Sequence, residues 1–364
     1  MRSLTKFLPL FLFGAVGLAA AGRCAPAPDD EARFLAGLPV AGTPLESLSH
    51  SRGWAAYAGE FDRAWAQLDK HQLQTIAAWA PGAVGQYCAD TGPVFYPFSG
   101  PDFLYAHAFF PNATAYVLCG IEPIGPLPQV ENLRPETLDA SLAGLRQSLD
   151  TLLDFSFFIT KKMRTDLEDN RLSGTLPLLY IFLARSGCHI RDVSFIGLDG
   201  TGEITTGKTL APAVKIVFAD AGGKEQTLYY FCSDLSDDVV NRSGLLTWFT
   251  GLGAGRGLLK AASYLMHGGA FDKLRQFLLS NCDAILEDDS GIPIRYFSLQ
   301  DWTLHLYGAY HLPIERFKKY PQPEMERLTA EQKPAGLPFS VGYRWHPGES
   351  SLIWAVKGAG RAGQ

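Results

Sequence analysis

The first candidate site in this sequence consists of a short polar segment and a single carboxylate. Ser99, Gly100 and Asp102 follow one strand-like apolar run, and Glu122 follows the next such run along the chain. In α/β proteins, ligands bind beyond the carboxyl ends of parallel strands, where diverging loops leave room for them. We therefore expect these four residues near a ligand, with Glu122 placed to accept hydrogen bonds from hydroxyl groups.

The order and spacing of these residues resemble the first half of a Rossmann-like or methyltransferase-like domain. The glycine fingerprint of such a domain is incomplete, because only Gly100 is present and Pro101 removes a backbone donor. Asp102 would also repel an anion at the start of the following helix. Ser99 and Asp102 have, in addition, the S-x-x-D spacing of a capping box, which any helix can use. Capping and ligand binding both remain open for this segment, and phosphate binding is disfavoured.

A second polar cluster, Glu287, Asp288, Asp289 and Ser290, follows a short apolar run later in the chain. Clustered carboxylate oxygens at a strand end can hold a hard cation or orient sugar hydroxyls. The EF-hand spacing is absent, so no metal ligand is predicted, and an acidic turn in solvent is the alternative. The nearby aromatic side chains, which could stack on a sugar or fill the core, are Tyr296, Phe297, Trp302, Tyr307, Tyr310, Tyr343 and Trp345.

The glycine-rich segment is a weaker motif. Gly251, Gly253, Gly255 and Gly257 lie between a predicted strand and a predicted helix, where a backbone cradle could surround a ligand. They match neither the dinucleotide nor the phosphate-loop pattern, which favours a flexible turn.

The sequence identifies no conventional catalytic group. His267 and His305 stand alone, without the H-E-x-x-H spacing of a metal site. A G-x-S-x-G elbow is absent, so a conventional α/β-hydrolase is disfavoured. Ser99, Ser290 and Asp289 could still belong to an unconventional triad. Catalytic residues and cofactor therefore stay unknown at this point.

The patterns around these residues predict a mixed α/β fold. A strand, a helix and a strand within 94–121 form a βαβ unit, and continuous apolar strands fit a parallel sheet covered on both faces. Helices are predicted over 135–152, 155–167 and 176–184, and antiparallel hairpins over 189–232. The predicted fold class is a mixed, mainly parallel Rossmann-like sheet with helices on both faces and antiparallel hairpins at its edge.

Further elements are predicted toward the C-terminus. A helix is expected over 258–267, directly after the glycine-rich segment, and another over 271–281. Strands are expected over 245–249, 284–286, 303–307, 339–343 and 352–356, with the last two forming a hairpin.

Composition and charge exclude several classes of protein. The 364 residues are 47% hydrophobic and 19% charged, which excludes a disordered chain or a coiled coil. The 32 lysines and arginines against 37 aspartates and glutamates leave a net charge of −5, so a nucleic-acid partner is disfavoured. After the first 21 residues, no segment is long and apolar enough for a stable membrane span.

The N-terminus has the pattern of a secretory signal peptide, with two basic residues, an apolar run and small residues that end at Ala21. We predict residues 1–21 as the signal peptide, 22–50 as an Ala/Pro-rich spacer and 51–364 as a single large α/β domain. Lipidation at Cys24 is the lesser alternative, because an arginine precedes it. A periplasmic or secreted location permits disulfides, and one or two are expected among the six cysteines.

Four segments, YPFSGPDFLYA, YVLCGIEPIG, LKAASYLMH and EDDSGIPIRYF, together resemble an uncharacterised family of exported bacterial proteins. The resemblance covers most of the chain after residue 50. It implies export, and it implies no activity, cofactor or site residue.

Three functions are compatible with these patterns. The first is an exported protein that binds a small polar molecule or glycan at the carboxyl edge of its sheet. The second is an enzyme, either a carboxylate-dependent hydrolase or a methyltransferase-like protein. The third is a structural or interaction protein of the cell envelope with a degenerate Rossmann-like core. For the first, we expect Glu122 and the Asp288–Asp289 turn to converge at one edge of the sheet.

Cleavage near Ala21 is the first testable prediction. The intact mass of the protein recovered from a bacterial periplasm should show the loss of about twenty residues, because the small residues there suit a signal peptidase. Soluble cytosolic protein that retains Met1 would contradict it.

Overall fold

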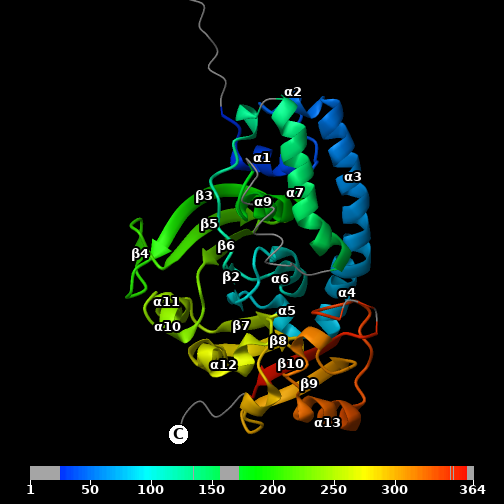
Figure 1. Ribbon diagram of the computed structural model, residues 1–364, viewed down its shortest axis with the longest axis vertical. Helices are drawn as coiled ribbons and strands as arrows, with labels where there is room; N and C mark the ends of the chain where they lie inside the picture. The colour runs from blue at the N-terminus through cyan, green and yellow to red at the C-terminus, as the bar shows by residue number, and fades with distance from the viewer. Residues whose placement is uncertain (1–24, 134, 156–171, 345, 347, 359–364) are drawn as a thin grey trace, which may run out of the picture.

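One ten-stranded sheet, covered by helices, forms the centre of the molecule (Figure 1). The computed structural model describes residues 25–133, 135–155, 172–344, 346 and 348–358. The sheet contains both parallel and antiparallel strands, so the predicted mixed α/β class is confirmed. The predicted signal peptide, Cys24 and nearly all of the helix predicted over 155–167 lie outside the described residues.

The strands are β1 (Val94–Tyr96), β2 (Ala115–Gly120), β3 (His189–Leu198), β4 (Ile204–Thr205), β5 (Ala211–Ala219), β6 (Glu225–Cys232), β7 (Gly255–Leu259), β8 (Cys282–Glu287), β9 (Trp302–Gly308) and β10 (Ser351–Lys357). The α-helices are α1 (Pro28–Leu35), α2 (Glu46–Ser49), α3 (Arg52–Leu68), α4 (Gln74–Ala83), α5 (Gln86–Ala89), α6 (Phe103–Phe109), α7 (Pro135–Phe155), α9 (Leu176–Arg185), α10 (Asp237–Val240), α11 (Leu245–Gly251), α12 (Asp272–Asn281) and α13 (Pro323–Gln332). A π-helical turn, Asp69–Leu73, joins α3 to α4.

The middle of the sheet is parallel, and antiparallel strands flank it on both sides. Across the sheet the order is β4-β3-β5-β6-β2-β1-β7-β8-β10-β9. Strands β6, β2, β1, β7 and β8 are parallel neighbours, whereas β5 and β10 run antiparallel to them. Val94 of β1 lies opposite Tyr116 of β2 on one side and Arg256 of β7 on the other. The carboxyl ends of β2, β1, β7 and β8 therefore meet along one edge of the sheet.

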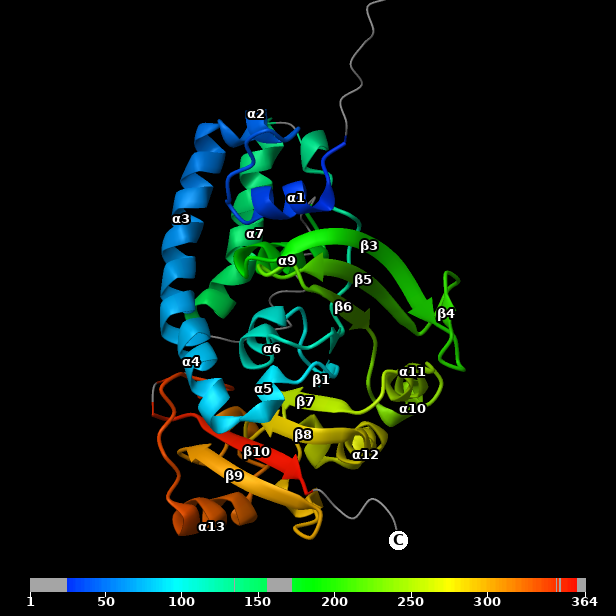
Figure 2. The same cartoon turned by 180° about the vertical axis from the view of Figure 1, so that it is seen from behind.

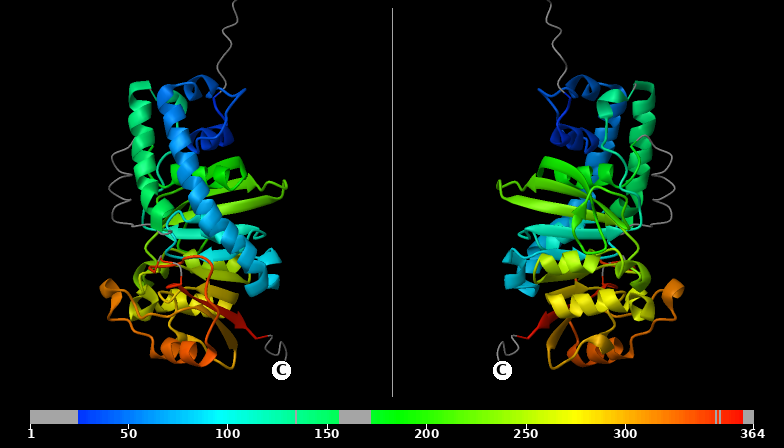
Figure 3. Two further views of the ribbon diagram at one scale, coloured as in Figure 1. Left: turned by 90° about the vertical axis from the view of Figure 1, so that its right-hand side faces the viewer. Right: turned by 90° about the vertical axis from the view of Figure 1, so that its left-hand side faces the viewer.

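Helices bury both faces of this sheet, as Figures 2 and 3 show. One face packs against α1, α3, α4, α6, α7 and α9, and the other packs against α11, α12 and α13. Alternate strand residues enter the two cores, with Tyr96 and Leu258 in the first and Phe95 and Leu259 in the second. Burial on both faces is the reason why these strands read as continuous apolar runs in the sequence.

The segment predicted as a spacer contains a core helix. Composition predicts a flexible stretch over 22–50, but Ala32, Phe34 and Leu35 of α1 are fully buried, and α1 packs against α9. Proline at the first helical position and three acidic residues in the first turn suit a helix N-terminus, so an Ala/Pro-rich composition did not exclude a helix here. Part of this segment therefore packs into the same core as the sheet.

The predictions around the glycine-rich segment are wrong in their element types. Residues 245–249 belong to helix α11, and Gly255 and Gly257 lie inside strand β7 instead of in a turn. A Cβ added at Gly255 would lie 2.4 Å from the carbonyl oxygen of Pro93, so the close approach of the chain before β1 requires glycine there. Short apolar runs such as 245–249 carry too few residues for their period to separate a strand from a helix.

The predicted C-terminal hairpin is also absent from the described residues. Strand β10 pairs with β8 and β9, and the stretch predicted as its partner contributes only an isolated bridge between Val341 and Arg344. The helix predicted over 258–267 is replaced by the end of β7, a turn and a short 3-10 helix, Leu265–His267. Pairing between strands across the sheet determined both the position of β10 and the extent of β7. This pairing cannot be seen in the local sequence pattern.

Five cysteines, Cys88, Cys119, Cys188, Cys232 and Cys282, are described, and all five are free thiols. The one or two disulfides expected from the sequence are therefore absent among them. In the part of the chain with described coordinates, no helix has the length and apolar character needed to cross a membrane.

Candidate functional site

A buried ion pair connects the loops after β1 and β7. The Lys260 Nζ atom lies 2.8 Å from Oδ2 of Asp102, and both side chains are 2% exposed. The Tyr96 hydroxyl donates to the same oxygen at 2.8 Å, and the ammonium lies 3.5 Å from the centroid of the Tyr105 ring. Burial lowers the pKa of Lys260, and the Asp102 charge counteracts that effect.

Asp102 also begins helix α6. Its Oδ1 accepts a hydrogen bond from the Tyr105 backbone N–H at 3.3 Å, so Asp102 is itself the N-cap residue. The capping box predicted for Ser99 is therefore wrong. The Ser99 hydroxyl accepts the Cys119 N–H at 3.1 Å and donates to the Gly100 carbonyl at 2.8 Å, which ties the loop after β1 to strand β2.

Glu122 follows β2 as predicted, but its side chain turns inward. The residue is 2% exposed, and the Tyr230 hydroxyl lies 2.9 Å from its carbonyl oxygen and 3.3 Å from Oε2. A Cβ added at Gly120 would lie 2.3 Å from Oε2 of Glu122 and 3.0 Å from Cα of Gly100. The glycines after β1 and at the end of β2 therefore leave the space in which this carboxylate lies.

The cluster at the end of β8 is buried, which rules out the alternative of an acidic turn in solvent for Glu287 and Asp288. Asp288 accepts hydrogen bonds from the N–H groups of Ala261 at 2.8 Å and Ser290 at 2.9 Å. The Ser290 hydroxyl donates to Asp288 at 2.5 Å and accepts the Ala262 N–H at 2.7 Å. Burial raises the pKa values of Glu287 and Asp288. These bonds join the loops after β7 and β8.

Asp289 lies outside this buried layer, partly exposed and among tyrosines. The Tyr264 hydroxyl donates to its carboxylate. The Tyr264 ring stacks on Tyr320, with centroids 5.5 Å apart and planes 6° apart, and on Tyr343 at 6.3 Å and 14°. Burial, followed by the charge of Asp288, raises the pKa of Asp289 to about 7. A carboxyl group with such a pKa can give and take a proton at neutral pH.

The turn after β7 adopts a backbone that side-chain-bearing residues rarely take. Positive φ angles occur at Ala261 (53°), Ser263 (55°) and Tyr264 (56°), and at Phe98 (60°) in the loop after β1. The Tyr343 hydroxyl holds this turn, since it donates to the Ala261 carbonyl at 2.7 Å and accepts the Ser263 N–H at 3.1 Å. Strained backbone costs about 1–3 kcal/mol per residue and concentrates at functional sites.

The structure brings the residues singled out in the sequence to one edge of the sheet. Loops after β1, β2 and β8 carry Ser99, Gly100, Asp102, Glu122, Asp288, Asp289 and Ser290. Strands β2 and β8 are three positions apart in the sheet, which corresponds to about 14 Å at the usual strand spacing. Their role toward a ligand stays a prediction.

Sequence reasoning missed Lys260, Ser263 and Tyr264, because the segment LKAASYLMH was predicted as a helix. The available signal was the position of Lys260, directly after the short apolar pair that ends β7. Of the predicted aromatic residues, Tyr310 lies near Asp289 and Tyr343 near Asp288, and Phe297 and Trp302 pack together in the core. Trp345 lies outside the described residues.

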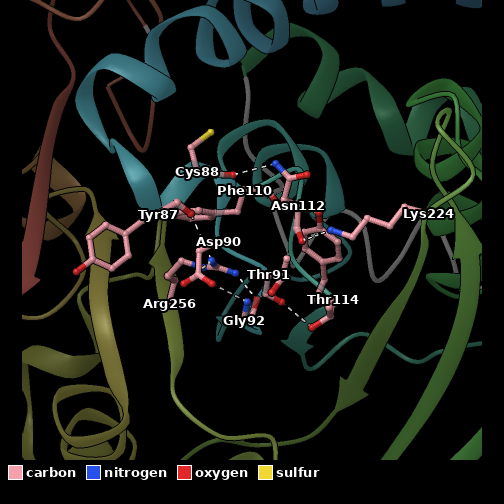
Figure 4. Close-up of polar contacts among 11 residues, drawn as sticks. Tyr87, Cys88, Asp90, Thr91, Gly92, Phe110, Asn112, Thr114, Lys224 and Arg256 are labelled. Atoms are coloured by element: carbon pink, nitrogen blue, oxygen red, sulfur yellow. Dashed lines mark hydrogen bonds and ion pairs between the residues drawn. The ribbon is translucent and has the colours of Figure 1, made fainter.

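A second buried cation, Arg256, lies at the opposite edge of the sheet (Figure 4). Its guanidinium donates to the carbonyl oxygens of Tyr87 and Gly92 and lies 3.1 Å from an Asp90 carboxylate oxygen. The ring of Phe110 lies 5.4 Å from the guanidinium carbon. These contacts fix the segment that enters β1, so we assign Arg256 a structural role.

Neither a metal-ligand cluster among the described residues nor a match to a known protein indicates which ligand or reaction the site serves. Among the described residues, no cluster of three or more histidine, cysteine, aspartate or glutamate side chains could hold a metal ion. No protein-family model matches the chain, and neither a curated protein nor a solved structure was found to match it. The site must therefore be interpreted from its own geometry.

Replacement of Asp102 by alanine should destabilise the protein by about 3–5 kcal/mol, because it leaves the Lys260 charge buried without a partner. Chemical denaturation measures the loss, and the double variant D102N/K260M should recover most of it. As a control, E331Q breaks the exposed pair with Arg327 and should cost less than about 1 kcal/mol. Equal losses for D102A and E331Q would contradict the role of the buried pair.

The raised pKa of Asp289 predicts a pH dependence of stability. The pKa of its carboxyl group is about 7 in the folded protein and 3.8 in the unfolded chain. At pH values between these two, the folded state therefore keeps a proton that the unfolded state has lost. The free energy of unfolding should therefore fall as pH rises from about 4 to about 7, and level off above. Asp289→Asn should reduce this slope, to which the raised pKa values of Glu287 and Asp288 also contribute, whereas D283N, at an exposed carboxylate on β8, should leave it unchanged. Identical pH profiles for wild type and D289N would contradict the prediction.

Proposed function

We propose that this protein binds a small polar, hydroxyl-rich ligand at the carboxyl edge of its parallel strands, over the loops after β1, β7 and β8. The observation that carries the proposal is the coincidence of buried charges with a strained turn at this edge. Asp102, Lys260 and Asp288 are buried there beside the partly exposed Asp289, and the turn that begins at Ala261 contains three of the positive-φ residues. Perturbed titratable groups and strain concentrate at functional sites.

The strand order supports the same location. Numbered along the chain, the five parallel strands have the spatial order 3-2-1-4-5, as in a Rossmann-like sheet. The chain leaves β1 through α6 on one face toward β2, and leaves β7 through α12 on the other face toward β8. The crevice between β1 and β7 is the switch point at which such sheets bind ligands. We therefore propose a Rossmann-like core, with antiparallel β10 where a sixth parallel strand would lie.

The chemistry of the outer residues favours hydroxyl groups as the recognised feature. Asp289 can accept hydrogen bonds from sugar hydroxyls, and the partly exposed Tyr320 and Tyr343 rings, stacked on the buried Tyr264, supply flat apolar surface beside it. This combination of carboxylate and aromatic planes suits a monosaccharide or a short glycan better than an apolar molecule.

A nucleotide cofactor in the loop after β1 is disfavoured. Asp102 and Lys260 close the start of α6 with their own ion pair, and Glu122 is directed inward to Tyr230. The groups that would contact a pyrophosphate and a ribose are therefore already engaged. These closed contacts also favour a second candidate, an interaction protein of the cell envelope with a degenerate Rossmann-like core.

Hydrolysis is the enzymatic alternative, and the pKa of Asp289 near 7 favours it. A carboxyl group poised at that pH can serve as general acid or base. Export remains part of the proposal, since residues 1–21 carry the signal-peptide pattern.

Thermal unfolding with sugars tests the proposal. Glucose, N-acetylglucosamine and maltose at millimolar concentration are added to wild type, to D289N and to the control D283N. A ligand that binds the native state raises the midpoint, so at least one sugar should stabilise wild type and D283N but not D289N. No shift with any sugar, or an equal shift in D289N, would overturn the proposal.

A further inference from the structure

Three exposed basic residues, Arg295, Arg316 and Lys319, surround the aromatic stack beside Asp289, and we call them the basic rim. Arg295 donates to the His267 carbonyl at 3.4 Å. Arg316 lies 5.5 Å from the centroid of the Phe317 ring, and Lys319 lies 4.9 Å from that of Tyr320.

The rings connect these residues to the candidate site. Tyr264, whose hydroxyl bonds to Asp289, packs against Phe317 at 5.0 Å and Tyr320 at 5.5 Å, and against His267 at 5.0 Å. Each residue of the basic rim thus contacts a residue that touches Tyr264.

No carboxylate of the described residues lies within ion-pair distance of the basic rim. Neighbouring cations are paired, as in Arg275 with Asp272 and Lys318 with Glu315. Among the residues that the structure describes, no ion pair involves Arg295, Arg316 or Lys319. In a chain of net charge −5, three uncompensated cations around one aromatic stack are a local excess of positive charge.

A buried imidazole lies within the same group. His267 is 9% exposed, and its Nε2 atom has no hydrogen-bond partner among the described residues. Burial, together with the charges of Arg295 and Arg275, lowers the pKa of His267 to about 4, so the ring is neutral at pH 7 and adds no charge. A neutral imidazole with an unsatisfied nitrogen can donate or accept one further hydrogen bond.

We propose that the ligand carries a phosphate group, which the basic rim binds while Asp289, Tyr320 and Tyr343 contact its hydroxyl-bearing part. The inference rests on the proposed function and adds the substrate class, a phosphorylated sugar or a phosphate-bearing glycan. Arginine presents a fork of donors that matches phosphate oxygens, and lysine adds a point charge. Three uncompensated cations suit a doubly charged group better than a single carboxylate.

Titration of the full chain with inorganic phosphate at constant ionic strength tests the inference, with calorimetry as the readout. The double variant R295Q/K319Q should weaken phosphate binding by about tenfold or more. R191Q, which changes an exposed arginine on β3, should bind as wild type does. The changed residues are exposed, so unchanged thermal midpoints are expected, and circular dichroism checks the fold. Failure of wild type to bind phosphate, or equal binding by the double variant, would overturn the inference.

Further measurements identify the source of the phosphate. They also distinguish a failure of this inference from a failure of the proposed function. Glucose 6-phosphate that binds wild type more tightly than inorganic phosphate indicates a soluble sugar phosphate. Binding to phosphatidylglycerol vesicles but not to phosphatidylcholine vesicles, lost in R295Q/K319Q, assigns the phosphate to a lipid headgroup. If uncharged glucose binds in an Asp289-dependent way while both phosphate probes fail, the proposed function stands and the phosphate inference is wrong.

Discussion

The buried ion pair between Asp102 and Lys260 is the interaction on which the carboxyl edge of this protein depends. Removing two charges from water costs several kcal/mol per ion, and only close partners offset that cost. Here Tyr96, Tyr105 and the start of α6 supply those partners. The pair joins loops that follow neighbouring strands, and Lys260 stands directly before the strained turn. The pair therefore anchors the start of that turn, which Asp288, Ser290 and Tyr343 hold further along.

Strand β7 is held by a buried cation at each end. Arg256 near its start donates to the carbonyl oxygens of the segment that enters β1, and Lys260 after its end pairs with the loop that leaves β1. Because β7 is only five residues long, the two cations fix β1 and β7 against each other over the whole length of their contact. A strand pair that is clamped at both ends provides a rigid base for the loops above it.

On that base, the candidate site has two layers with different properties. The inner layer of Asp102, Lys260, Glu122 and Asp288 is buried, and its known hydrogen bonds join loops of the protein to one another. The outer layer, with Asp289, Tyr320 and Tyr343, is partly exposed and lies over the buried Tyr264 ring. The inner layer thus orients the outer one, and such preorganisation would reduce the entropy lost on binding the ligand that we propose.

Much of the fold could be predicted from the sequence, because it depends on local pattern. The leucine stripe of α7 and the apolar run of α9 predicted buried helices, and the continuous strands in 94–121 predicted a parallel βαβ unit. The loops after β1, β2 and β8 were also placed correctly at strand ends. The periodicities of helices and strands extend over only a few residues, so they can be recognised in the sequence itself.

The remainder was decided by tertiary structure. Gly255 and Gly257 lie in a strand because β1 and β8 pair with that segment, and helix α1 forms part of the core because α9 covers it. The inward direction of Glu122, the pairing of Lys260 with Asp102 and the pKa of Asp289 depend on groups far apart in the chain. The sequence by itself determined the residues that follow β1, β2 and β8, but not those that follow β7. Only the folded protein, which excludes water and brings distant charges within a few ångströms, decided which of them are buried, paired or partly exposed.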